Sequence, residues 1–334
     1  MVTLQTIADE LGVSASTVSR VVNKKGYVKE STRQRIAEAV KRRNYFPYNA
    51  ARSLKTGQSH AIGVIIPDVT EIFFTNVLSS VEAELSEAGY SMLLCITGED
   101  KNKEALYLNF FSQNHADGII LATVADDLGP LLEILDRGRS IVCIDNLPDT
   151  VSAFDAVISD NVYASELAVN YLSGLGHKRI AMITGKQTET TGVERLTGYR
   201  KAMEKLFGTV DDKLIGYGDY KEQSGYTAMK NILGISPDIT AVHAASSKMT
   251  YGAVKAIYEC GKKVPDDISV VGFDVYDPTG LIKPGITTIR QQEDGIGKMA
   301  CRLLLESIRR PEHRVRRKIL LQPELVVRDS CRNL

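Results

Sequence analysis

Residues 3–22 carry two short hydrophobic stripes, each with the three-to-four residue spacing of a helix. The first stripe comprises Leu4, Ile7, Ala8 and Leu11, and the second comprises Val18, Val21 and Val22. Thr3 and Ser14 stand where a hydroxyl caps a first helical turn, and Gly12 stands where the first helix must end. The pattern predicts two packed amphipathic helices joined by a tight turn.

The polar face of the second helix has the side chains of a DNA-recognition helix. Ala15, Ser16 and Ser19 are small, which allows the helix to approach base edges. Arg20 follows one turn later, where a guanidinium can make a bidentate contact with guanine. The alternative interpretation is a generic pair of surface helices in which Arg20 is only solvated.

A third helix and an asymmetry of charge favour the DNA interpretation. An apolar stripe predicts a helix from a Ser31 or Thr32 cap to about Asn44. Residues 1–59 contain eleven Lys or Arg and four Asp or Glu, a net charge of +7, whereas the whole chain has 41 of each kind. The remaining residues therefore carry a net charge of −7. A basic head on an acidic body is expected when only the head contacts phosphates.

Beyond residue 60 the pattern changes to short apolar runs that alternate with segments of helical period. The runs are rich in Val, Ile and Leu and lie at 61–66, 91–96, 118–121, 141–144, 179–183, 240–243 and 268–273. Such runs are typical of buried parallel strands connected by helices, so we expect a layered α/β body. Ligands of such sheets bind beyond the carboxyl ends of the strands.

Together these features resemble the LacI (LacI/GalR) family of bacterial transcription regulators, and the resemblance covers essentially the whole chain. It implies an all-α helix-turn-helix headpiece, a hinge helix, and an α/β effector domain of two doubly wound lobes like those of type I periplasmic binding proteins. We expect the headpiece at 1–46, the hinge at 47–59 and the effector-binding and dimerisation domain at 60–334. Lobe one then comprises about 60–157 and 290–321, and lobe two about 158–289 and 322–334.

The hinge segment Tyr48–Leu54 follows Pro47, which suits the first turn of a helix. The resemblance implies that Leu54 of each of two subunits enters the minor groove and kinks the operator. An inert linker is the alternative, and it predicts an unchanged operator affinity for Leu54→Ala. The expected DNA-contacting residues are Thr3, Ser14, Ala15, Ser16, Thr17, Ser19, Arg20, Asn23, Tyr45, Asn49, Ala51, Arg52, Leu54 and Lys55.

Candidate effector-binding residues follow the predicted strands of the body. Phe73 and Phe74 come after the first strand, where the family covers its ligand, although either ring can instead belong to the core stripe of the next helix. Asp145 and Asp274 each follow a buried strand, where a carboxylate can accept ligand hydroxyl groups. Asp274 matches the ligand aspartate of the family, whereas a helix cap or a loop hydrogen bond explains Asp145 about as well.

The segment Gly192–Tyr199, GVERLTGY, resembles the family's ligand-binding arginine at the start of a helix, and this role falls to Arg195. A lone arginine would more often be a solvated helix residue. Thr191 and Tyr220 fall where the family has a polar and an aromatic cleft residue. Asn161 follows a predicted crossing strand and either contacts the ligand or caps the next helix.

One segment departs from the family pattern. Many members carry Asp or Asn in a D-x-x-A-x-G pattern, and this chain has Ser247, followed by Lys248, in its place. The usual sugar acceptor is missing, and these two side chains near Arg195 suit an effector with a phosphate or carboxylate group. A Lys248 that faces solvent is the alternative. We therefore expect a sugar or sugar derivative as effector, with an anionic group as a further hypothesis.

The chain lacks the motifs of common enzyme classes. It has no P-loop, no G-x-G-x-x-G that opens a strand-to-helix unit and no G-x-S-x-G nucleophile elbow. Its 5 His and 5 Cys are scattered, so we expect neither a metal nor a cofactor. Without a signal peptide or a long apolar span, we expect a cytoplasmic protein with no membrane contact. The alternatives to a regulator are a cytoplasmic sugar-binding protein and a sugar-modifying enzyme on the same fold.

The expected assembly is a homodimer on a pseudo-palindromic double-stranded operator, because one small headpiece gives little specificity and the hinge wedge needs a partner. No heptads follow Leu325–Val327, so a tetramerising coiled coil is not expected. An effector would change lobe closure and hinge spacing, and a coupling of about 1–3 kcal/mol changes operator affinity about 5- to 150-fold. We expect a repressor of a carbohydrate-related operon. The effector either releases the repressor from the operator or promotes its binding there, and the sequence does not decide between the two.

Overall fold

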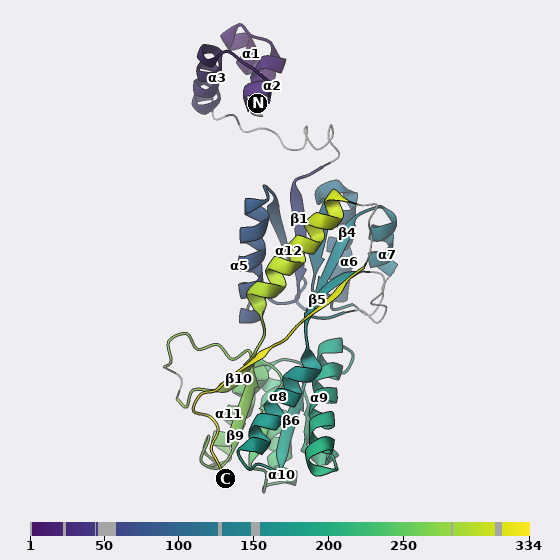
Figure 1. Ribbon diagram of the computed structural model, residues 1–334, viewed down its shortest axis with the longest axis vertical. Coiled ribbons are helices and arrows are strands. Elements are labelled where there is room, and N and C mark those ends of the chain that lie inside the picture. Colours follow the sequence, from purple (N-terminus) through teal and green to yellow (C-terminus); the bar gives the residue numbers. More distant parts are fainter. Residues whose placement is uncertain are drawn as a thin grey trace. The chain divides into compact units, whose positions relative to one another are not determined.

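The computed structural model describes residues 2–22, 25–43, 45, 58–125, 129–147, 154–281, 283–310 and 316–334. The chain divides into two compact units, a head (1–59) and a body (60–334), and both are drawn in Figure 1. Across the described residues, no helix combines the length and the apolar character that crossing a membrane requires.

The described part of the head is a bundle of three helices, α1 (Leu4–Leu11), α2 (Ala15–Val22) and α3 (Glu30–Arg42). Thr3 caps α1 as predicted, because its Oγ1 accepts a hydrogen bond from the Thr6 amide at 3.1 Å. Gly12 ends α1 with a left-handed φ of 65°. The predicted stripes meet in one small core of Ile7, Ala8, Val18, Ile36 and Ala39.

The start of α3 differs from the prediction. Lys29 occupies the cap position without a side-chain hydrogen bond, and the helix begins at Glu30. Ser31 and Thr32 therefore lie within the first turn and do not cap it. Glu30 is in the first turn, where the helix dipole stabilises a negative charge. The helix ends at Arg42, two residues before the predicted end.

In the described residues, the body contains two six-stranded sheets, each at the centre of one lobe (Figure 1). All strand pairs of the lobe-one sheet are parallel. Its strands in spatial order are β11 (Lys318–Leu321), β5 (Asp155–Ser159), β4 (Ser140–Ile144), β3 (Gly118–Leu121), β1 (Ala61–Ile66) and β2 (Ser91–Ile96). Its helices are α5 (Ile72–Glu87), α6 (Lys101–Phe110), α7 (Gly129–Asp136) and α12 (Glu293–Arg309), with a π-helical turn η1 (Phe111–His115) after α6.

Helices on both faces of this sheet explain its uninterrupted apolar strands. The helices α5 and α12 lie side by side on one face (Figure 1), and their buried side chains share a core with β1 and β3. Leu108, Phe111 and Leu131 cover the other face. A Cβ on Gly63 would lie 2.7 Å from the Phe111 ring, so the glycine in β1 allows this close approach. Strands buried on both faces need no polar alternation.

The lobe-two sheet has the same layered plan. Its strands in spatial order are β12 (Glu324–Val326), β10 (Thr287–Arg290), β9 (Ser269–Phe273), β8 (Ala241–Ala244), β6 (Ile180–Thr184) and β7 (Ile215–Tyr217). The pair β10 and β12 is antiparallel, and the other pairs are parallel. The helices are α8 (Asn161–Gly174), α9 (Thr190–Phe207), α10 (Glu222–Ile235) and α11 (Ser247–Glu259), with a 3-10 turn η3 (Asp212–Leu214).

Over the residues that the structure describes, the chain passes between the lobes three times, after β5, after β10 and after β11. The crossings were expected near 157–158, 288–289 and 322–323. In the structure β5 continues to Ser159 and β10 to Arg290, so the first two crossings come slightly later than expected. The predicted combination of a helical headpiece and a two-lobed α/β body is confirmed.

Candidate functional site

The polar face of α2 carries the residues that the sequence assigns to DNA. Ser16 and Arg20 are exposed, and Thr17 and Ser19 are half-buried. The Ser14 Oγ lies 2.8 Å from the hydroxyls of both Ser16 and Thr17. It also accepts a hydrogen bond from the Thr17 amide at 3.2 Å, which caps the helix as predicted. The first turn of α2 therefore presents hydroxyl groups, and Arg20 lies one turn farther along.

Other predicted DNA contacts of the head also serve its fold. Ala15 was expected to face outward, but it is half-buried and packs on the head core, because it lies three residues before Val18 on the same helix face. Tyr45 packs on the same core. Thr3 is exposed and caps α1. The predicted contacts Asn23, Asn49, Ala51, Arg52, Leu54 and Lys55 lie outside the described residues.

Part of the positive charge of the head is paired within it. Arg42 and Arg43 both donate hydrogen bonds to the Glu10 carboxylate, the latter from Nε at 2.8 Å. These hydrogen bonds, from Arg43 and then from Arg42, hold the pKa of Glu10 below its usual range. The two arginines therefore tie the end of α3 to α1.

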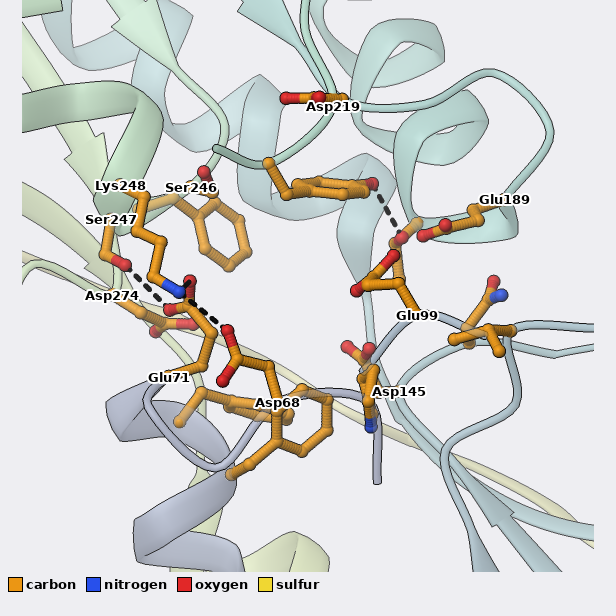
Figure 2. Close-up of a pocket in the computed structure, with 18 of the residues that line it drawn as sticks. Asp68, Glu71, Glu99, Asp145, Glu189, Asp219, Ser246, Ser247, Lys248 and Asp274 are labelled. Carbon is orange, nitrogen blue, oxygen red and sulfur yellow. Dashed lines mark hydrogen bonds and ion pairs between the residues drawn. The ribbon is translucent and has the colours of Figure 1, made fainter. Parts of the chain in front are cut away.

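A cavity of about 130 Å³ lies between the lobes of the body, beyond the carboxyl ends of strands from both sheets (Figure 2). Residues from loops far apart in the sequence meet there. Among the predicted effector residues, those that line the cavity are Phe73, Phe74, Asp145, Thr191, Arg195, Tyr220, Ser247 and Asp274. Asn161 does not line it.

Arg195, from the first half of α9, is 5% exposed and rigidly held. Its Nε donates a hydrogen bond to Asn161 Oδ1 at 2.8 Å, and its Nη1 donates to the Ala245 carbonyl at 2.7 Å. The guanidinium carbon lies 3.7 Å from the centre of the Phe273 ring. Among the described residues no partner accepts a hydrogen bond from Nη2, so this nitrogen is available to ligand oxygens in the cavity.

Asn161 positions Arg195 instead of touching the cavity. It is 2% exposed, and its Nδ2 donates to Glu194 Oε2 at 3.0 Å while its Oδ1 accepts from Arg195. The cap of α8 comes from Asp160, whose carboxylate accepts a hydrogen bond from the Tyr163 amide at 3.0 Å. The predicted helix cap for Asn161 is therefore wrong, because Asp160 supplies it. A direct contact of Asn161 with the effector stays a prediction.

Asp145 and Asp274 face the cavity from opposite lobes (Figure 2). Both have left-handed φ values, 61° and 50°, which aspartate tolerates better than most residues. The backbone and side-chain nitrogens of Gln291 donate to the Asp274 carboxylate at 3.0 and 2.7 Å. Burial raises the pKa of Asp145 to about 6 and that of Asp274 to about 7. Both groups can therefore exchange a proton near neutral pH.

Aromatic side chains form walls of the cavity. The Tyr220 hydroxyl lies 2.8 Å from the Thr191 hydroxyl. A Cβ on Gly185 would lie 2.1 Å from the tyrosine ring, so a glycine is required beneath it. Phe73 and Phe74 pack edge to face with their ring centres 5.0 Å apart. Both side chains belong to the core of lobe one, and both line the cavity. The core role and the cavity role of this pair are therefore compatible.

Ser247 and Lys248 contact acidic residues of the opposite lobe (Figure 2). The Ser247 Oγ donates to Glu71 Oε2 at 2.9 Å. The Lys248 Nζ lies 2.7 Å from Asp68 Oδ2 and 3.2 Å from Glu71 Oε1. The solvent-facing alternative for Lys248 is therefore wrong. Because both side chains are engaged by protein carboxylates, they offer little to an anionic ligand group.

The cavity lining as a whole is acidic. Its charged residues are Asp68, Glu71, Glu99, Asp145, Glu189, Asp219 and Asp274 against Arg195, Lys221 and Lys248. Asp68 and Glu71 were not predicted, although the strand-end rule applied to the segment after β1 would have found them. Glu99 and Glu189 carry no sequence motif. Among the described residues, no cluster of His, Cys, Asp or Glu could hold a metal ion.

Known proteins resemble this chain along its full length. Residues 3–48 match the model of bacterial regulatory proteins, lacI family, and residues 169–331 match a periplasmic binding protein-like domain. The HTH-type transcriptional repressor PurR of Vibrio campbellii is 34% identical over 336 residues, covering 100% of both chains. The transcriptional regulator CelR–cellobiose complex is 30% identical, with a TM-score of 0.75 over 99% of this chain and 100% of that chain. The lac repressor dimer bound to operator and the anti-inducer ONPF is 26% identical, with a TM-score of 0.88 over 99% of each chain.

Proposed function

Because the chain belongs to the lacI family of bacterial regulatory proteins, we propose that an uncharged, hydroxyl-rich effector in its cleft controls its binding to an operator. The protein is a DNA-binding transcriptional repressor with a periplasmic-binding-protein-like body. The observation that carries the proposal is the acidic lining around one buried arginine.

The chemistry of the lining favours a neutral sugar. Carboxylates such as Asp145 and Asp274 accept hydrogen bonds from hydroxyl groups, and Arg195 donates to ring or hydroxyl oxygens. The rings of Phe73 and Tyr220 can pack on the apolar face of a sugar. A phosphate or carboxylate in the cavity would face the surrounding carboxylates, which disfavours an anionic effector. The cellobiose bound to CelR, a similar regulator, supports a carbohydrate and hence a carbohydrate-related operon.

The head supplies the DNA contacts in this proposal. Ser16 and Arg20 on α2 read base edges in the major groove, and Leu54 of the hinge wedges into the minor groove. The protein acts in the cytoplasm, on the chromosome itself. An effector that alters the angle between the lobes changes the distance between the two hinge segments of a dimer, and thereby the operator affinity.

We place part of the dimer interface at the free edge of the lobe-one sheet. The edge strand β2 leaves Leu93, Leu94 and Ile96 37%, 38% and 38% exposed. Exposed apolar edge strands are an aggregation hazard unless a partner covers them. A second copy that covers β2 removes this hazard and brings two heads to one operator. Leu94→Lys is expected to yield monomers in analytical ultracentrifugation.

Thermal-shift screening tests the effector class. Neutral mono- and disaccharides are compared with their phosphates and sugar acids, and the most stabilising compound is then added to an operator gel-shift assay. We expect stabilisation by a neutral sugar, loss of that stabilisation in Arg195→Met, and a change in operator retardation. Stabilisation by anionic sugars alone would refute the neutral class. A sugar-binding protein without a transcriptional role would not retard a palindromic operator at physiological salt, and an enzyme would return the sugar chemically altered.

A further inference from the structure

Two lysines of lobe two reach across the cleft to carboxylates of lobe one. Lys248 lies in the first turn of α11, and its ammonium lies between Asp68 and Glu71 in the segment that joins β1 to α5. It also donates to the Thr70 hydroxyl at 3.0 Å. The side chains of Lys248, Asp68 and Glu71 are 32%, 33% and 21% exposed. The cavity therefore has the positive charge of Lys248 at one end.

The second lysine stands in the loop after β6. Lys186 donates a hydrogen bond to Glu99, which follows β2 in lobe one, and its Nζ lies 3.1 Å from Glu189 of its own lobe. The side chains of Lys186 and Glu99 are 28% and 36% exposed. Figure 2 shows Glu99 and Glu189 on the side of the pocket opposite Lys248. The two ion pairs thus span the cleft on both sides of the cavity.

The ion pairs keep their charge despite partial burial. Burial lowers the pKa of Lys248, but the hydrogen bond with Asp68 and the charge of Glu71 outweigh it and raise the pKa above the ordinary value. The pKa of Lys186 is also raised, because the effect of burial is outweighed by the hydrogen bond with Glu99 and the charge of Glu189. Half-buried pairs are screened less by salt than exposed ones.

A neutral contact between the lobes provides an independent gauge of closure. The Thr190 amide, in the first turn of α9, donates to Asn146 Oδ1 of lobe one at 2.8 Å. The Leu147 amide of lobe one donates to Thr190 Oγ1 at 3.0 Å. Both amides donate hydrogen bonds from one lobe to the other, so they lose this protection from exchange when the lobes part.

From these contacts we propose that Lys248 and Lys186 are positioning residues that close the two lobes before any effector binds. The cleft then owes its closure to two protein ion pairs, and the effector needs only to fit among Arg195, Asp145 and Asp274. The segment at Ser247 and Lys248, which departs from the family's sugar-acceptor pattern, serves closure instead of ligand contact. This inference rests on the proposed function only for the effect of closure on DNA binding.

Hydrogen–deuterium exchange of the full-length protein, without DNA or sugar, tests the closure itself. In Lys248→Met, peptides that contain Thr190 and Leu147 are expected to exchange about two- to fivefold faster, the effect of losing an ion pair of ordinary strength. The Lys186→Met/Lys248→Met double variant is expected to exchange faster still. Lys248→Arg keeps the charge and is expected to stay near the wild type.

The matched control is Lys255→Met, on the same helix α11. The Lys255 Nζ lies 3.8 Å from Glu222, and both residues belong to lobe two, so its loss should leave the cleft peptides unchanged. Peptides from β8 and β9 report the stability of the lobe-two core. Unchanged exchange at Thr190 and Leu147 in the double variant would overturn the proposal. An equal acceleration in β8 and β9 would also overturn it, since the lysines would then stabilise the fold and not closure. Neither result depends on whether the protein binds an operator.

Discussion

Replacement of Asp145 by asparagine is expected to stabilise the ligand-free protein at neutral pH and to have little effect at acidic pH. Burial raises the pKa of Asp145 to about 6, although the Arg195 charge opposes this shift. An aspartate in an unfolded chain titrates at about 3.9. The folded protein therefore binds this proton more tightly than the unfolded chain. Between about pH 4 and 6, the free energy of unfolding should fall as pH rises, because the native carboxyl group must ionise in a poorly solvated place.

The size of the effect follows from the shift in pKa. A rise of roughly two pKa units corresponds to about 3 kcal/mol, and solvent that reaches the cleft reduces this to about 1–2 kcal/mol. Asparagine has nearly the same shape, does not titrate, and tolerates the left-handed φ of 61° at this position. Asp145→Asn should therefore exceed the wild type by about 1–2 kcal/mol at about pH 7.5, and by much less at about pH 4.5.

Urea unfolding followed by circular dichroism, repeated across this pH range, measures the difference. Asp274 also titrates in the cleft, but it is present in both proteins and its contribution largely cancels. Asp266→Asn, on the exposed surface of lobe two, is the matched control and should show no such trend. A constant difference between Asp145→Asn and the wild type at all pH values would mean that folding does not raise the pKa of Asp145. Lower stability of the variant at neutral pH would show that Arg195 stabilises the charged carboxylate more than burial penalises it.

Three further variants test the remaining structure. Arg195→Met should lower the free energy of unfolding by about 3–5 kcal/mol in urea titrations, because it leaves buried acceptors such as the Ala245 carbonyl without a donor; an unchanged midpoint would contradict this. Gly198→Ala would place a Cβ 2.1 Å from the Val162 carbonyl oxygen, so calorimetry should show a loss of about 1–3 kcal/mol as α9 moves off α8; equal melting temperatures would mean that the helices are not in close contact. Arg20→Ala should weaken operator binding by about 1–3 kcal/mol in anisotropy titrations and reduce the ratio of the affinities for operator and random DNA. Equal weakening on both DNAs would indicate a phosphate contact.

Elements whose formation depends on local sequence were predicted without the structure. In the head, the spacing of apolar residues and the Thr3 and Ser14 hydroxyls sufficed, since helix faces and caps depend on neighbours within one turn. In the body, β1, β2 and β3 have the predicted bounds, because each strand is marked by its own apolar run. The strand-end rule also placed Asp145 and Asp274 at one cavity, and the resemblance to the LacI family placed Arg195 there.

The roles of the individual side chains in the cleft could not be predicted without the folded structure. Asn161 supports Arg195 from beneath, and Lys248 pairs with Asp68 of the other lobe, because loops distant in the sequence meet where the lobes face each other. Burial and the sign of nearby charges are properties of that meeting and not of any one segment. For the same reason the acidic character of the cavity is hidden in the sequence, where its carboxylates are spread over loops of both lobes.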